Sequence, residues 1–396
     1  MAEALEQALS GLTDLRSYAT PEAVVGELDP DYPIFCVRPH AIHRAARLFL
    51  EKFPGDTLYA VKCNPMPHML KALYEAGIRH FDTASLAEIA RVTQLFPESI
   101  CYFMHPVKAR AAIREAHERY GVRHHVVDHL SELEKIDDVI ASSRDVVILV
   151  RLAVHHQAVV YDLSTKFGTS TDEALELLAE IDTRGFSAGL CFHVGSQCLD
   201  ADAYRVGMES VKEVLTRTRV PLRCIDVGGG FPGRYLNHPV GDLASYIATI
   251  VETTQGLELP GDGRLFCEPG RGLSESGESL IVQVQLRKSD AVYLNDGIYG
   301  SMNEEQTGLR RPHRMLATRD FDPSLRPFTV YGPTCDSIDV LPAPVDLPAD
   351  IREGDWIEFG GMGAYGVACR TAFNGFFPDS FVAVENEFVA DLRATD

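Results

Sequence analysis

The stretch Tyr59-Ala60-Val61-Lys62-Cys63-Asn64-Pro65 is a short apolar run that ends in a lysine and is followed by an Asn-Pro pair. The apolar residues predict a buried strand, and Asn64-Pro65 predicts a turn directly after it. Barrel enzymes keep their active sites at such carboxyl ends of strands. Apolar surroundings are expected to lower the pKa of the Lys62 ammonium, and the free amine can then condense with an aldehyde. The alternative is an ordinary solvated loop lysine.

Strand and helix patterns alternate on both sides of this stretch. Apolar runs predict strands at residues 33–37, 58–61, 81–84, 100–104, 124–127, 146–152, 189–193, 223–227 and 264–267. Helical periodicity fills most of the intervals, as in residues 67–76 and in residues 40–53, whose expected buried face is Ile42, Ala45, Ala46, Phe49 and Leu50. About eight strand-helix units with parallel strands predict a closed (β/α)8 barrel.

The sequence pattern changes after Leu273. Short apolar runs bounded by Gly, Pro and Asp predict strands at residues 279–287, 291–294, 328–331, 356–359 and 381–384. We therefore expect three parts: a lead-in over residues 1–38, a barrel over 39–275, and a mostly β domain over 276–396. The lead-in is expected to hold a loose helix, and its strand near Phe35 is expected to join the β domain.

Composition excludes several classes of protein. The chain has 396 residues, 45% of them hydrophobic, and a formal charge of −20, which disfavours nucleic acid as a partner. No apolar run is long enough for a membrane helix. Residues 1–6 do not resemble a signal peptide, so a cytoplasmic location is expected. The nine cysteines lack metal-ligand spacing and are expected to be reduced, mostly buried thiols, with no metal site.

Three further motifs follow predicted barrel strands. His193 offers a flat ring for stacking, and Ser196 offers a hydroxyl to a phosphate. Three consecutive glycines, Gly228 to Gly230, allow backbone N–H groups to close around an anion, without the spacing of nucleotide-binding loops. Glu268 can keep a pyridine nitrogen protonated, and Arg271 can bind a phosphate or a carboxylate. The structural alternatives are a core histidine, a tight loop and a salt bridge at the barrel rim.

Two small-residue loops in the expected β domain present polar side chains. Gly332-Pro333-Thr334-Cys335-Asp336-Ser337 places a thiol beside a carboxylate, and Gly363-Ala364-Tyr365 presents a phenol. The thiol can donate a proton in a closed site, while Asp336 can pair with a substrate ammonium. A β-turn with one buried thiol is the alternative.

Taken in order from Ile34 to Phe376, these motifs resemble the fold-type III pyridoxal-phosphate decarboxylases, and most closely their ornithine decarboxylase branch. The resemblance implies pyridoxal phosphate as the cofactor and a homodimer in which each site is completed by the partner's β domain. It also implies a Lys-Phe-Gly loop near the site entrance, here Lys166-Phe167-Gly168.

The resemblance further implies a role for each matching residue. Lys62 bonds the cofactor, His193 stacks on its ring, Glu268 bonds its nitrogen, and the acidic pair Asp82 and Glu88 lies near the lysine and the cofactor. The implied phosphate-binding residues are Ser196, Gly230, Arg271 and Tyr365. Gly228 and Gly229 belong to the same loop, and Gly270 is a further implied cofactor-binding residue. Cys335 protonates the product carbanion, and the implied substrate-binding residues are Cys335, Asp336, Tyr299 and Tyr365.

The identity of the substrate depends on residues near 300. Asn295 to Ser301 matches the ornithine branch, but the aspartate with which that branch grips a distal ammonium falls at about Gly308, where Glu304 or Glu305 could substitute. Arg310 and Arg311 suggest instead the distal carboxylate of meso-diaminopimelate. We expect decarboxylation of L-ornithine or lysine to the diamine and CO₂. The open alternatives are diaminopimelate decarboxylation, a racemase, which would carry arginine in place of Glu268, and a cofactor-free regulator of the antizyme-inhibitor type.

Overall fold

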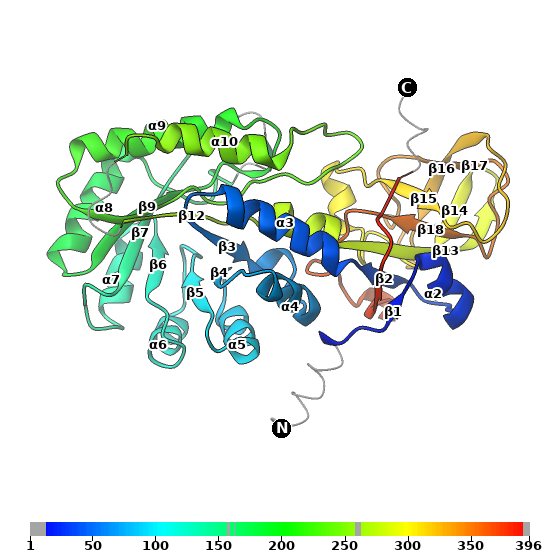
Figure 1. Ribbon diagram of the computed structural model, residues 1–396, viewed down its shortest axis with the longest axis horizontal. Coiled ribbons are helices and arrows are strands. Elements are labelled where there is room, and N and C mark those ends of the chain that lie inside the picture. The colour runs from blue at the N-terminus through cyan, green and yellow to red at the C-terminus, as the bar shows by residue number, and fades with distance from the viewer. Residues whose placement is uncertain (1–12, 157–158, 162, 258–262, 391–396) are drawn as a thin grey trace.

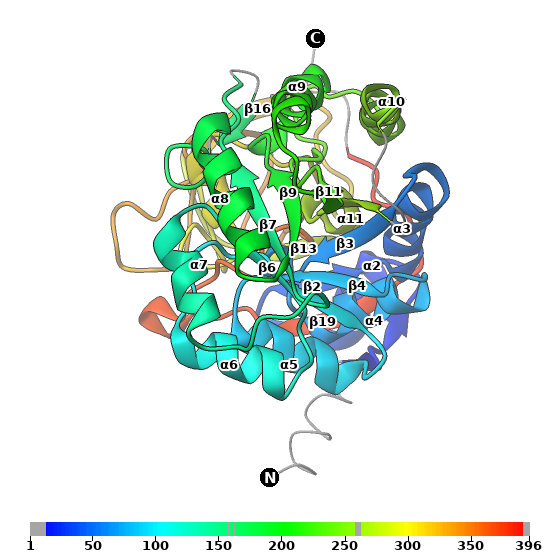
Figure 2. The same ribbon diagram turned by 90° about the vertical axis from the view of Figure 1, so that its left-hand side faces the viewer.

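Eight parallel strands close into a barrel in the computed structural model, which describes residues 13–156, 159–161, 163–257 and 263–390 (Figures 1 and 2). Around the barrel the order is β11 (Leu222–Asp226), β12 (Arg264–Cys267), β3 (Asp56–Ala60), β4 (His80–Thr83), β5 (Ile100–Phe103), β6 (His124–Val127), β7 (Val147–Leu152) and β9 (Ser187–Phe192). The expected barrel with a second, mostly β domain is confirmed. Residues 1–12 of the expected lead-in and residues 391–396 lie outside the described ranges.

Helices surround the outside of the barrel (Figure 2). They are α3 (Pro39–Lys52), α4 (Pro67–Glu75), α5 (Leu86–Leu95), α6 (Arg110–Glu118), α7 (Leu130–Asp137), α8 (Thr171–Thr183), α9 (Asp202–Arg217) and α10 (Leu243–Thr254). In α3, Ile42, Ala46 and Phe49 are buried as expected, but Leu50 is 42% exposed. The prediction for Leu50 was wrong because it lies about 100° from Phe49 around the helix, beyond the edge of the buried face. None of the helices in the described ranges is long and apolar enough to span a membrane.

A nine-stranded sheet forms the second domain (Figure 1). Its strands are β1 (Ser17–Tyr18), β19 (Ser380–Val384), β2 (Ile34–Val37), β13 (Glu278–Lys288), β14 (Ala291–Leu294), β16 (Leu325–Tyr331) and β17 (Val345–Pro348), with β18 (Trp356–Phe359) and β15 (His313–Met315) on a side branch. Strand β2 pairs with β13 and with β19. The N-terminal strands β1 and β2, which flank α2 (Pro21–Leu28), therefore belong to the sheet formed by the C-terminal third of the chain.

A short hairpin-like pair, β8 (Val159–Tyr161) with β10 (Ser196–Cys198), was not expected from the sequence. It joins the segment after β7 to the segment after β9, both of which leave the barrel at the carboxyl ends of its strands. The pair brings Tyr161 opposite Ser196. This places two additional polar side chains at the mouth of the barrel.

A buried ion pair ties the N-terminal strand to the C-terminal sheet. The Arg38 guanidinium, 1% exposed, donates to Glu358 at 2.8 Å and to the Ser279 hydroxyl at 2.7 Å. The other oxygen of Glu358 accepts from Arg314 at 2.7 Å. Because every partner is buried or half-buried, removing one of them leaves a charge without compensation.

We expect Glu358→Ala to lower the free energy of unfolding by about 3–5 kcal/mol, because Arg38 would remain buried without its carboxylate. The matched control is Arg44→Ala, which breaks an exposed pair with Glu387 and should cost less than about 1 kcal/mol. Urea unfolding of both variants measures the difference, and equal losses would contradict the structural role of the buried pair.

Candidate active site

A cavity of about 430 Å³ opens at the carboxyl ends of the barrel strands. Its lining combines residues from the barrel and from the β domain: Ala60, Lys62, Tyr161, Leu163, His193, Ser196, Gly229, Gly230, Phe231, Glu268, Gly270, Arg271, Asn303, Glu304, Thr307, Tyr365 and Cys369. Most of the residues singled out from the sequence thus meet in one place. Tyr161, Asn303, Thr307 and Cys369 were missed, because no local motif marks them.

Lys62 follows strand β3 in the short helix η1 (Val61–Cys63), where the backbone turns out of the barrel. Its Nζ lies 3.1 Å from Oδ2 of Asp82, which is 2% exposed at the end of the neighbouring strand β4. Burial by itself lowers the pKa of Lys62, but Asp82, Glu268 and Tyr365 together raise that pKa above its ordinary value. The expected lowering of the pKa was therefore wrong, because acids rather than apolar walls surround the ammonium.

Two further carboxyl groups lie on the other side of Lys62 along the barrel. Asp226 ends β11 and accepts the Gly228 N–H at 2.8 Å through Oδ1. Asp226 Oδ2 and Glu268 Oε1 are buried and have no hydrogen-bond partner within the described part of the chain. Burial raises the pKa of Asp226 to about 7, and burial together with Asp226 and Asp82 raises the pKa of Glu268 well above its usual range. Through its Oε1, Glu268 can therefore accept a hydrogen bond from a ligand group, and a cationic group at this position would favour the ionised carboxylate.

His193 leaves strand β9 and presents its ring to the same cavity. Its Nδ1 accepts the Gly195 N–H at 3.0 Å. Burial, followed by Arg151 and Lys62, lowers the pKa of His193 well below its usual range, so the ring is neutral. A Cβ at Gly229 would lie 2.9 Å from His193 Nε2. Only glycine at position 229 leaves room for the flat ring where it stands.

The far end of the cavity is built for an anion. The glycine loop after β11 contributes Gly230, whose φ of 104° favours glycine and where a Cβ would lie 2.6 Å from Val194 Cγ2. Arg271, 4% exposed, points its guanidinium into this end, with Nη2 3.5 Å from the Ser196 hydroxyl. The Tyr365 ring lies 5.0 Å from the same guanidinium, and Tyr365 has a φ of 60°. Such a backbone conformation is uncommon for a tyrosine and recurs at functional sites.

Three expected cofactor residues lie at different distances from the cavity surface. Gly270 lines the cavity. Gly228 does not, but a Cβ there would collide with the Phe192 carbonyl oxygen, so Gly228 lets the loop pack against β9. Glu88 accepts the Ala84 N–H at 2.7 Å, and burial raises its pKa. Glu88 therefore supports the turn after Asp82 rather than lining the cavity.

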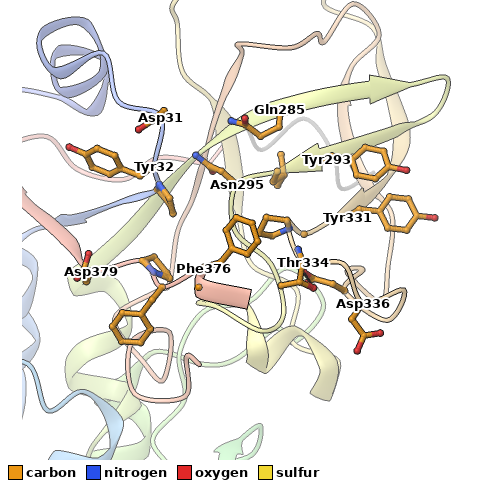
Figure 3. A pocket seen from close by; sticks show the side chains of 18 of the residues that line it. Asp31, Tyr32, Gln285, Tyr293, Asn295, Tyr331, Thr334, Asp336, Phe376 and Asp379 are labelled. Carbon is orange, nitrogen blue, oxygen red and sulfur yellow. Dashed lines mark hydrogen bonds between the residues drawn. The ribbon is translucent and has the colours of Figure 1, made fainter. Parts of the chain in front are cut away.

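Of the expected substrate residues of the β domain, Tyr365 lines the Lys62 cavity, but Cys335, Asp336 and Tyr299 do not. Cys335 is exposed and its thiol donates to Asn374 Oδ1 at 3.2 Å. The Tyr299 hydroxyl donates to Asp336 Oδ2 at 2.6 Å, which lowers the pKa of Asp336. Asp336 lines a second cavity, of about 970 Å³, with aromatic residues such as Tyr331 (Figure 3).

The two arginines considered for a distal carboxylate are committed elsewhere. Arg311, 2% exposed, donates to Glu304 at 3.2 Å and to the Gly361 carbonyl. Arg310 donates to the Pro344 carbonyl at 2.8 Å. Neither side chain lines the Lys62 cavity. Of the two glutamates considered for a distal ammonium, only Glu304 lines it.

Comparison with known proteins gives a consistent set of matches. Residues 40–275 match the family model described as pyridoxal-dependent decarboxylase, pyridoxal binding domain. The chain is 32% identical over 348 residues to the probable ornithine decarboxylase of Dictyostelium discoideum, covering 81% of this chain and 72% of that protein. It is 32% identical over 354 residues to the lysine/ornithine decarboxylase of Selenomonas ruminantium, covering 86% and 87%. The crystal structure of lysine/ornithine decarboxylase complexed with cadaverine from Vibrio vulnificus superposes with a TM-score of 0.79 at 29% identity, covering 93% and 100%.

The raised pKa of Asp226 predicts a pH dependence of stability. Between about pH 4, where an unfolded aspartate titrates, and about pH 7, the folded chain holds a proton that the unfolded chain has released. Asp226 therefore stabilises the fold at low pH, and this contribution, up to about 4 kcal/mol, is lost as the pH rises through that interval. In Asp226→Asn, the free energy of unfolding should fall less steeply as the pH rises. In the exposed control Asp320→Asn, it should fall as in wild type. Urea unfolding midpoints measured across this pH range test the prediction. If the midpoints of wild type and Asp226→Asn change in parallel with pH, Asp226 does not make this contribution.

Proposed function

The chain belongs to the pyridoxal-dependent decarboxylase family, and from this premise we propose that it converts L-ornithine or lysine into the corresponding diamine and CO₂. The observation that carries the proposal is the convergence of Lys62, His193, Glu268 and Arg271 on one cavity. The names of the relatives, ornithine decarboxylase and lysine/ornithine decarboxylase, support a basic amino acid as the substrate.

Pyridoxal phosphate is the cofactor, and the cavity has a matching group for each part of it. Glu268 Oε1, which has no hydrogen-bond partner among the residues that the structure describes, suits a protonated ring nitrogen. The neutral His193 ring suits stacking on the pyridine, and the glycine loop with Arg271 suits the phosphate. Lys62 Nζ is the amine for the aldehyde. We take residues 39–275 as the cofactor-binding unit and residues 276–396, with the strand of the 1–38 lead-in, as the β domain.

The chain's own residues then divide the reaction among them. The cofactor, once bound, withdraws the electron pair that remains on the substrate Cα when CO₂ leaves. Lys62 would hold the cofactor through its Nζ. Glu268 would bond the ring nitrogen, and His193 would hold the ring plane. Cys335 of a second subunit would donate a proton to the substrate Cα.

A distal ammonium fits the residues better than a distal carboxylate does. Asp336 is half-buried, and the Tyr299 hydroxyl donates to its carboxylate, which orients the carboxylate and lowers its pKa. Arg310 and Arg311 are bound to a backbone carbonyl and to Glu304, so they are not free for the second carboxylate of diaminopimelate. We therefore assign Asp336 to the distal ammonium and rank diaminopimelate below ornithine and lysine.

Cys335, Asp336 and Tyr299 can act only if another subunit brings them to the Lys62 cavity, so we propose a homodimer with shared sites. Exposed aromatic rings near the Cys335 loop support this proposal: Phe373 is 40% exposed, and Phe376 and Phe377 are 42% and 43% exposed. Stacked on Phe373, the Tyr299 ring extends the apolar surface. The nine cysteines are free thiols, which supports a reducing compartment such as the cytoplasm.

We expect purified protein loaded with pyridoxal phosphate to release CO₂ from ornithine or lysine faster than from arginine or diaminopimelate. Lys62→Ala should abolish the visible absorbance of the bound cofactor and lower turnover at least about a thousandfold. The control Lys71→Ala removes a lysine that pairs with Asp14 on the surface and should change neither. Release of CO₂ from diaminopimelate alone would overturn the substrate assignment, and full activity of Lys62→Ala would overturn the role of Lys62.

Mixing the variants Lys62→Ala and Cys335→Ala tests the shared site. Cys335→Ala should consume substrate slowly or protonate the carbanion wrongly, and Lys62→Ala should be inactive. If each site takes Lys62 from one subunit and Cys335 from the other, random exchange of subunits should restore roughly a quarter of wild-type activity. Sedimentation of the same mixtures reports the dimer. A mixture whose subunits exchange but which forms diamine no faster than Cys335→Ala alone would rule out a shared site.

A further inference from the structure

The guanidinium of Arg271 is already occupied by a carboxylate of the protein itself. Glu304 accepts from both terminal nitrogens of Arg271, at 3.0 Å from Nη1 and 2.6 Å from Nη2. The remaining N–H of Nη1 goes to the Tyr235 hydroxyl, and that of Nη2 goes to Ser196 at 3.5 Å. Only Nε of Arg271 is buried without a partner among the residues described. The two-pronged face that arginine offers to a phosphate is therefore filled.

Glu304 reaches this position from the short helix η3 (Asn303–Thr307), which the β domain contributes to the cavity. Its side chain is 8% exposed, and the Arg271 side chain is 3% exposed, so both charges are largely removed from water. A carboxylate and a phosphate dianion on one buried guanidinium repel each other much more strongly than they would in solvent. Burial also raises the pKa of two nearby acids, Glu275 and Glu305, to about 7, but Glu304 is the acid that contacts the Arg271 guanidinium.

We propose that Glu304 is a positioning residue that competes with the cofactor phosphate for Arg271 and thereby sets how tightly the cofactor is held. The inference rests on the proposed function, because it takes pyridoxal phosphate as the ligand of the cavity. Loading then requires the Glu304 carboxylate to leave Arg271. Arg311 provides the place to which it moves, since Glu304 Oε2 is already 3.2 Å from Arg311 Nη2.

Competition between the Glu304 carboxylate and a ligand phosphate can be distinguished from a purely structural role of Glu304. Only ligands that carry a phosphate have to displace the Glu304 carboxylate. Pyridoxal has the same ring and aldehyde but no phosphate, so it should bind equally well to proteins with and without this carboxylate. Glu304→Gln keeps the size of the side chain and removes its charge. Glu305→Gln is the matched control, because Glu305 lies on the same helix but contacts Arg311, at 3.1 Å from its backbone N–H, and not Arg271.

The experiment measures dissociation constants of the ligand-free full-length protein by equilibrium dialysis against pyridoxal phosphate, pyridoxal and inorganic phosphate. For Glu304→Gln we expect pyridoxal phosphate and inorganic phosphate to bind at least about tenfold more tightly than to wild type, the size typical of one charged hydrogen bond. Pyridoxal should be unchanged, and Glu305→Gln should match wild type for all three ligands. Glu304→Asp, whose shorter side chain draws the carboxylate back from Arg271, should be intermediate and serves if the glutamine variant does not fold.

Each result has one meaning. Unchanged or weaker binding of pyridoxal phosphate by Glu304→Gln overturns the inference, because the carboxylate would then support Arg271 rather than compete for it. An equal gain for pyridoxal overturns it as well, since the effect would not depend on the phosphate. Wild-type protein that binds no pyridoxal phosphate at all contradicts the proposed function instead.

Discussion

The site depends on one imbalance of charge: three buried carboxyl groups face one ammonium, on a side chain that is 43% exposed. Four neighbouring strands, β11, β12, β3 and β4, each deliver one of these groups at the same end of the barrel, namely Asp226, Glu268, Lys62 and Asp82. Parallel strands in a closed barrel make this meeting unavoidable, because their carboxyl ends share one rim. Desolvated carboxyls this close together are harder to ionise, and the pKa values of Asp226 and Glu268 are raised accordingly.

The two ends of the cavity solve the same problem of buried charge in opposite ways. Near Lys62, oxygens of Asp226 and Glu268 remain without partners among the described residues, so the fold carries a cost there that a suitable ligand can relieve. At the other end, Arg271 is engaged by Glu304, Tyr235 and Ser196. A cationic ligand group thus finds these oxygens at the acidic end. At the cationic end, an anionic ligand group has to displace the present partner of Arg271.

The sequence was sufficient for the barrel and for the residues at its rim, and insufficient for how those residues interact. Lys62, His193 and Glu268 could be predicted because each directly follows an apolar run whose length marks a strand. The pKa of Lys62 was predicted in the wrong direction, because Asp82 lies twenty residues away in the chain and becomes a neighbour only through β3–β4 pairing. The Glu304 contacts with Arg271 and Arg311 likewise depend on the packing of two domains, which local patterns do not encode.

The acidic surroundings of Lys62 also bear on how the amine can react. An ammonium forms no bond to an aldehyde until it loses its proton, yet Asp82, Glu268 and Tyr365 favour the protonated form. Under the proposed function, Glu268 gains a second positive partner when it meets a protonated pyridine nitrogen. The positive charge of Lys62 is then no longer needed to compensate the carboxylates, and the free-energy cost of deprotonating Lys62 falls. In the ligand-free protein, these carboxyl groups favour the protonated form of Lys62. Under the proposed function, Lys62 therefore loses its proton more easily once the ring nitrogen of the ligand has met Glu268.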